Sequence, residues 1–514
     1  MRRFLASLVV LILVVSASAV LASPERRPEA PAGQMSFALQ VSLAPVWFDP
    51  ADTTSTSIPF IVLYAVHDAL VKAMPGQPMA PSLAESWTVS RDGLVYEFVL
   101  RKGVKFHNGE PVTADDVKFS FERYRGTAAP AFKARLAAVE LDSQRIRFRL
   151  KQPWPDFMTY YGTPATGAGW IVPKKYVEKV GDEGFKRAPI GAGPYKFVSS
   201  NPGVELVLEA NEQYWRKTPS VRTLVFRSVP DSSTRLAMLK RGEVDVAFTF
   251  CGVLAEEVRR SPGLTLKAVS ASVTEWLYFA EQWDPKSPWA DRRVRLAANL
   301  AIDRQGLNDA ETLGLSRVTA SIIPRGFDFA WPAPLYEYDP GRAKRLLAEA
   351  GYPNGFEAGT LFSDVLYAQV AEAIANYFRP VGIRIVLQPI ERAGFFKAVQ
   401  EKRLKNVILI GSGALGSAAT RLETWVAPGG TYVYGSYSDV DELWRELPAA
   451  ADPKSRGVLL ERIQRLVHDK AIFAPIWEFP SICAHGPRVA ESGLGLIANY
   501  PFSAPYEDLR LKGK

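Results

Sequence analysis

Several stretches of the chain alternate apolar with polar side chains, a period that is typical of half-buried β-strands. Phe37, Leu39 and Val41 follow this period, and so do residues 96–100 and 204–208. Residues 145–151 carry four cations on one strand face and apolar side chains on the other. None of the residues on the cationic face is aromatic, so the pattern favours a solvated outer face over a basic binding ribbon.

Other stretches have helical spacing between clear start and stop signals. Residues 113–116 read Thr-Ala-Asp-Asp, which predicts a helix that begins with a capping box. Asp339 and Pro340 predict the start of another helix, which ends at Gly351. A third helix is predicted from residue 231 to Gly242, before a strand-like segment at 244–250. Short capped helices mixed with strands predict an α/β fold with inserted pieces.

The N-terminus predicts export. Arg2 and Arg3 precede an apolar run at 8–15, and the small residues 16–19 follow it before Val20, Leu21 and Ala22. This order is typical of a secretory signal peptide, here residues 1–22, cleaved after Ala19 or Ala22. The apolar run is shorter than the ~20 residues that a membrane-spanning helix needs, and no cysteine follows it for a lipid anchor. We therefore expect the mature protein in the periplasm.

Composition narrows the class of protein further. The 514 residues suggest about three structural units, and the mixture of 47% hydrophobic and 23% charged residues excludes a disordered chain. A net charge of +8 is too dilute for a nucleic-acid binder, which gathers its cations into one stripe. The four histidines are scattered, and no serine-nucleophile or phosphate-loop motif occurs. We therefore expect neither an enzyme nor a metal site nor a cofactor.

Two further features leave alternatives open. Cys251 and Cys483 can form a disulfide in an exported protein, or both can be buried thiols. Residues 411–416 match the dinucleotide-binding pattern G-x-G-x-x-G after a strand-like run. A lone match is weak, and a flexible glycine-rich loop over a ligand cleft suits these residues better.

Seven segments spread over the mature chain carry a family resemblance. They are LAESW at 83–87, GVKFHNG at 103–109, TADDV at 113–117, GAGPY at 191–195, LKRGEVDV at 239–246, DRRVR at 291–295 with AIDR at 301–304, and YDP at 338–340 with AGY at 350–352. In order and spacing they resemble the extracytoplasmic solute-binding proteins of family 5, the oligopeptide-, dipeptide- and nickel-binding subunits of ABC importers.

The resemblance implies a hinged, two-lobed periplasmic binding protein of α/β type. The first lobe would be discontinuous, with residues 35–70, 190–271 and 475–514, and a subdomain at 71–189 would be inserted in it. The second lobe would be residues 272–474, so two crossings near 271 and 475 would form the hinge. The solute would be enclosed between the lobes and delivered to a membrane permease with its ATPase subunits. We expect a monomer.

The resemblance also implies where the ligand binds. The family's cleft is lined by an early loop, by the start of the second lobe and by the glycine-rich loop with its following helix. The corresponding residues here are Trp47, Trp276, Tyr278, Gly411, Ser412, Gly413, Arg421 and Trp425. Each tryptophan is either a cleft wall or part of the core. Arg421 either offers a planar fork to a ligand carboxylate or forms a salt bridge.

One departure from the family bears on the ligand. Peptide-binding members carry an aspartate after the glycine-rich loop that receives the peptide's α-amino group. This chain has Ala418 and Ala419 there, with no acid between Gly411 and Thr420. Ordinary peptide transport is therefore in doubt, and the ligand stays open among a peptide, an opine-like amino-acid conjugate, a sugar oligomer and a metal chelate. An exported hydrolase, or a sensory or chaperone use of the same fold, remains the alternative function.

Overall fold

The computed structural model describes residues 30–53, 58–126, 128–164, 166–250, 252–413, 416–450 and 452–513. The predicted signal peptide lies outside these residues. Within them, none of the helices has the length and apolar character needed to cross a membrane.

Strands and helices alternate along the whole chain, as the sequence predicts. The strands are β1 (Ala32–Leu39), β2 (Asp68–Ala69), β3 (Val71–Met74), β4 (Gln77–Pro81), β5 (Ala84–Val89), β6 (Val95–Leu100), β7 (Leu136–Asp142), β8 (Arg145–Leu150), β9 (Trp170–Ile171), β10 (Tyr195–Asn201), β11 (Glu205–Ala210), β12 (Val221–Ser228), β13 (Val246–Ala247), β14 (Thr265–Phe279), β15 (Arg317–Val318), β16 (Phe356–Asp364), β17 (Ile383–Ile390), β18 (Val407–Ser412), β19 (Phe473–His485), β20 (Val489–Glu491) and β21 (Arg510–Leu511). The helices are α1 (Phe60–Val66), α2 (Ala114–Glu122), α3 (Ala129–Arg135), α4 (Phe157–Tyr161), α5 (Lys174–Arg187), α6 (Ser232–Arg241), α7 (Gly252–Arg260), α8 (Arg292–Ala301), α9 (Arg304–Thr312), α10 (Pro340–Glu349), α11 (Ala368–Phe378), α12 (Arg392–Gln400), α13 (Ala418–Trp425), α14 (Ser438–Glu446) and α15 (Pro453–Asp469).

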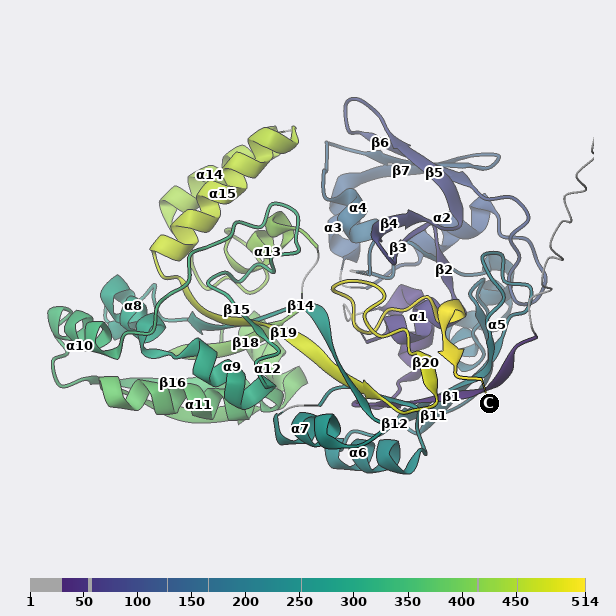
Figure 1. The fold of residues 1–514 in the computed structure, drawn as a ribbon. Helices are drawn as coiled ribbons and strands as arrows, with labels where there is room; N and C mark the ends of the chain where they lie inside the picture. The colour runs from purple at the N-terminus through teal and green to yellow at the C-terminus, as the bar shows by residue number, and fades with distance from the viewer. Residues whose placement is uncertain are drawn as a thin grey trace, which may run out of the picture.

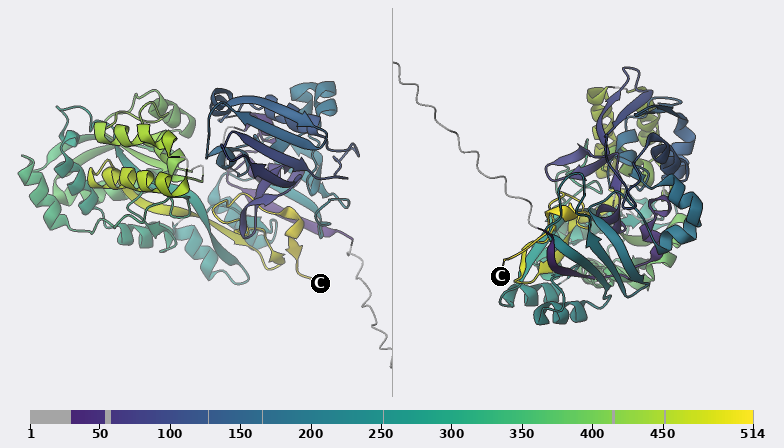
Figure 2. Two further views of the ribbon diagram at one scale, coloured as in Figure 1. Left: turned by 90° about the horizontal axis from the view of Figure 1, so that it is seen from above. Right: turned by 90° about the vertical axis from the view of Figure 1, so that its right-hand side faces the viewer.

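One mixed sheet runs through the whole molecule, in the order β10-β11-β12-β1-β13-β19-β14-β18-β16-β17 with β15 on the side of β19. Its two longest strands, β14 and β19, are antiparallel, and they connect the two halves of the molecule (Figure 1). The pairing register shifts between Val269 and Val273, in the middle of this connection. Two views show two lobes side by side, joined along these strands (Figures 1 and 2).

Each lobe has its own hydrophobic cores. The first lobe packs β1, α1 and the C-terminal segment around one core, and the sheet β5-β6-β8-β7 with α2, α3 and α4 around another. The second lobe packs α8, α10 and α11 on one face of the β14–β18–β16 sheet, and α13, α14 and α15 on the other. Along β19, Trp477 packs in the second lobe and Ile482 in the first, so this strand changes lobes between them.

The helix boundaries read from the sequence are confirmed. Thr113 caps α2 with the full capping box, in which its side chain and that of Asp116 bond each other's backbone N–H. Asp339 caps α10 by accepting from the backbone N–H of Arg342 at 2.7 Å. Asp231 caps α6, and Gly242 ends it in the left-handed conformation. Residues 244–250 form only the short strand β13, so that predicted strand was too long.

Arg145, Arg147 and Arg149 lie on the outer face of β8, as expected for a solvated face, and Lys151 follows the end of the strand. Arg145 and Arg147 both pair with Glu97 on the neighbouring strand β6, and Arg149 Nε donates to Glu140 on β7 at 2.6 Å. Cross-strand ion pairs of this kind neutralise the positive charge of these arginines locally. Cys483 is a buried free thiol, and Cys251 lies outside the described residues.

Candidate ligand cleft between the lobes

A cavity of about 260 Å³ lies between the two lobes, far more than the ~10–15 Å³ that one water needs. The first lobe contributes the β3–β4 hairpin, two threonines of the α4 region and the C-terminal segment. The second lobe contributes the segment before α10 and the end of the glycine-rich loop. The lining residues are Ala73, Met74, Gly76, Gln77, Pro78, Met79, Thr159, Thr163, Gly326, Phe327, Asp328, Gly416, Ile497, Ala498, Asn499 and Tyr500.

Asp328 is the acidic residue of this lining. Its backbone forms a short parallel bridge to Ser417, in which Ala418 N–H donates to the Asp328 carbonyl at 2.9 Å. Burial raises the pKa of the Asp328 carboxyl. Across the cavity, burial raises the pKa of the Tyr500 hydroxyl, and the Asp328 charge raises it further. A carboxylate and a phenol hydroxyl from opposite lobes therefore meet at this cavity.

Two ion pairs join the lobes beside the cavity. Arg456 on α15 donates to Asp156, the N-cap residue of α4, at 2.7 Å, and both side chains are less than 15% exposed. Arg135 on α3 donates to Glu423 on α13 at 2.9 Å, with 27% and 40% of the side chains exposed. Separating the lobes would break both pairs, so both favour the closed arrangement.

Arg421 lies beneath the glycine-rich loop, close to the point where β14 crosses between the lobes. Its Nη2 donates to the Ser412 carbonyl at 3.0 Å and to Thr274 Oγ1 at 3.3 Å, and the guanidinium lies 5.0 Å from the Trp276 ring centroid. Its Nε and Nη1 are buried, and among the described residues neither has a hydrogen-bond partner. Burial lowers the pKa of Arg421 to about 9, so this cation is held without a neighbouring acid.

The other second-lobe residues predicted from the sequence cluster around Arg421. Trp276 and Trp425 contact edge to face at 5.1 Å, and both are almost fully buried. Tyr278 is buried beside them and accepts from the Tyr434 backbone N–H at 3.0 Å. Gly411 and Ser412 end β18, and Gly413 follows. The structure therefore brings these seven residues together, but none of them lines the 260 Å³ cavity.

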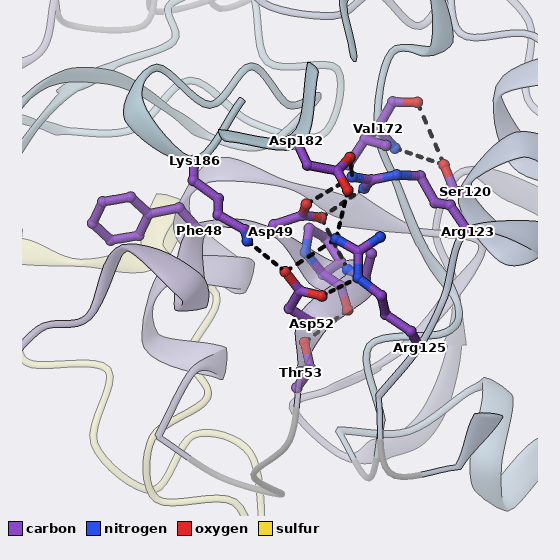
Figure 3. Close-up of polar contacts among 12 residues, drawn as sticks. Phe48, Asp49, Asp52, Thr53, Ser120, Arg123, Arg125, Val172, Asp182 and Lys186 are labelled. Atoms are coloured by element: carbon purple, nitrogen blue, oxygen red, sulfur yellow. Dashed lines mark hydrogen bonds and ion pairs between the residues drawn. The ribbon is translucent and has the colours of Figure 1, made fainter. Parts of the chain in front are cut away.

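Trp47 lies apart from this group, on a short 3-10 helix of the first lobe (Pro45–Phe48), where it packs half-buried against the core. The loop that carries it is anchored by a charge network drawn in Figure 3. Arg123 holds both carboxylate oxygens of Asp49, at 2.7 and 2.8 Å, and donates to Asp182 at 2.6 Å. Lys186 pairs with Asp52 at 2.8 Å. This network attaches the loop that carries Trp47 to α2 and α5.

The cavity residues Asp328 and Tyr500 were missed by the sequence reasoning. Gly416, the last glycine of the G-x-G-x-x-G motif, lines the cavity, so this motif was the feature of the sequence that could have indicated where the cavity lies. Asp328 lies about 90 residues earlier in the chain and meets that loop only through the tertiary bridge to Ser417. Among the described residues, no cluster of histidine, cysteine and acidic side chains could hold a metal ion.

Two lobes joined by paired strands, with a cavity between them, define a two-lobed α/β binding protein. The family model of the bacterial extracellular solute-binding proteins, family 5, matches residues 78–432. The chain belongs to this family, and it is a solute-binding protein of the class that serves ABC importers.

Individual relatives agree with this assignment. The chain is 30% identical to heme-binding protein A of Haemophilus influenzae, over 91% of this chain and 92% of that protein. It is 27% identical to the glutathione-binding protein GsiB of Escherichia coli K12, over 83% and 86%. Among solved structures, the periplasmic binding protein DppA of Helicobacter pylori, in complex with the peptide STSA, is 25% identical with a TM-score of 0.76, over 94% and 98%.

Proposed function

We propose that this chain is exported to the periplasm, loses residues 1–22, and captures a small polar solute between its lobes for delivery to the permease of an ABC importer. The observation that carries this proposal is the inter-lobe cavity, flanked by ion pairs that exist only when the lobes are closed. Contacts specific to the closed state are what a ligand needs in order to shift the open–closed equilibrium.

We propose a peptide-like solute or amino-acid conjugate as the ligand class. The relatives whose names mention glutathione and a peptide support this class, since both compounds carry carboxylates and amines. Arg421 is fully buried and lies outside the cavity lining, so a contact between it and an acidic group of the solute would require the glycine-rich loop to move. The predicted ligand-binding set, Trp47, Trp276, Tyr278, Gly411, Ser412, Gly413, Arg421 and Trp425, stays a proposal that rests on the family resemblance.

The lobe boundaries also stay a proposal. The first crossing near residue 271 is supported by the register shift between Val269 and Val273. For the second crossing we favour a position near residue 480 over 475, because Trp477 and Phe479 pack with the second lobe. We further propose that the protein acts as a monomer, without nucleic acid and without catalytic activity.

The test is native mass spectrometry of freshly purified periplasmic protein, followed by small-angle scattering with and without the solute that it retains. We expect a small solute to copurify, and its return to stripped protein to decrease the radius of gyration. An unchanged scattering profile on binding would contradict capture between closing lobes. N-terminal sequencing of the same sample should begin at Ser23 or Val20, and an intact Met1 would contradict export with cleavage.

A further inference from the structure

The acid that the sequence comparison finds missing after the glycine-rich loop has a replacement in the tertiary structure. Ala418 is fully buried as the first residue of α13, so that position offers no charge to a ligand. The backbone of Asp328, however, pairs with residues 416–418. Its N–H donates to the Gly416 carbonyl at 3.3 Å, and its carbonyl accepts from the Ala418 N–H at 2.9 Å. A different segment therefore brings a carboxylate to the same end of the helix.

Asp328 lines the inter-lobe cavity as a solvent-exposed residue, and no cationic partner is found for it in the part of the chain that the structure describes. Among the described residues, no lysine, arginine or histidine lies within ion-pair distance of it, whereas the two other acids at the lobe interface, Asp156 and Glu423, are both paired with arginine. Partial desolvation raises the pKa of the Asp328 carboxyl, although the residue as a whole is solvent-exposed. Because Asp328 is solvent-exposed at the cavity and has no arginine or lysine beside it among the described residues, its carboxylate is free to pair with a cation that enters the cavity.

The rest of the wall suits a compact cation with several N–H donors. Thr163 and Asn499 add polar atoms from the first lobe, and Tyr500 adds a hydroxyl. Met74, Met79 and Phe327 provide apolar surface around them. A primary ammonium group has three donors and accepts nothing, so carboxylate, hydroxyl and amide oxygens are its natural partners.

We propose that Asp328 is the residue that receives a protonated amine of the solute, in place of the aspartate that other family members carry after the glycine-rich loop. This inference rests on the proposed function, because it assigns one contact within the same cleft. It also removes the doubt about peptide transport that the sequence raised from Ala418 and Ala419.

The experiment compares free and N-acetylated forms of the same probes: glutathione, the dipeptide alanyl-alanine and the solute identified by native mass spectrometry. Calorimetry is run on the mature protein, on Asp328→Asn and on Asp115→Asn. Asparagine keeps the shape of Asp328 and removes its charge. Asp115 is an exposed acid on α2, outside the cavity lining, so its variant is the matched control.

We expect the free amine to bind at least tenfold more tightly than its acetylated form. Asp328→Asn should remove this preference by weakening the free amine alone, while Asp115→Asn keeps it. If a probe binds and closes the lobes but acetylation and Asp328→Asn change nothing, the inference is overturned and the proposed function stands. If neither the probes nor any copurified solute binds, the proposed function fails, and the inference fails with it.

Discussion

His67 gives a test of the loop that carries Trp47. This imidazole is fully buried at the end of α1, and its Nε2–H donates to the Phe48 carbonyl at 2.9 Å. Its other nitrogen, Nδ1, has no hydrogen-bond partner in the part of the chain that the structure describes. Burial lowers the pKa of His67 to about 4, so the folded protein keeps this side chain neutral at physiological pH. His67→Gln retains a donor for Phe48 but cannot take up a proton.

The sign of the pH effect follows from the two states of the chain. Unfolded, His67 titrates near its ordinary value of ~6.5, so between pH 6.5 and 4 the unfolded chain binds one more proton than the folded chain. Stability is therefore lost as the pH falls through this window, at ~1.4 kcal/mol per pH unit. Over the full window the loss reaches roughly 3 kcal/mol, which is a large part of a typical folding free energy.

Urea unfolding at pH 7, 6, 5 and 4.5 measures this effect, because the other titrating groups are common to both proteins and cancel in the difference. The His67→Gln variant should lose less stability than the wild type on acidification, with the gap growing by ~1.4 kcal/mol per pH unit. Parallel pH curves for wild type and His67→Gln would refute the reasoning.

Two further predictions compare matched pairs of variants. Arg456→Met removes the less exposed inter-lobe ion pair, and we expect calorimetry to show that solute affinity falls about tenfold. Arg135→Met removes the more exposed pair, and affinity should fall less than about fivefold. Equal losses for the two variants would contradict this ranking by burial. Gly355 and Gly351 both have positive φ, but a Cβ at Gly355 would lie 2.1 Å from the Gly382 carbonyl oxygen, whereas one at Gly351 meets nothing within 4 Å. By urea unfolding, Gly355→Ala should therefore cost ~2 kcal/mol more than Gly351→Ala, and similar losses would contradict the clash.

Local signals in the sequence determined much of the fold. The capping residues Thr113, Asp231 and Asp339 placed three helix starts correctly, because a cap is satisfied by backbone groups within the next turn. The family motifs likewise placed the chain among two-lobed binding proteins, because their order along the chain is visible without any coordinates.

The candidate site depended on contacts that no local pattern encodes. Asp328 and Tyr500 meet across the cavity although they lie far apart in the chain and belong to different lobes. The partners of Arg421 likewise depend on the tertiary structure, because the sequence alone could not show whether this cation forms a salt bridge or stays unpaired. Charge and hydrogen-bond partners in a cleft are set by the packing of distant segments, so only the tertiary structure decides which acid faces the ligand.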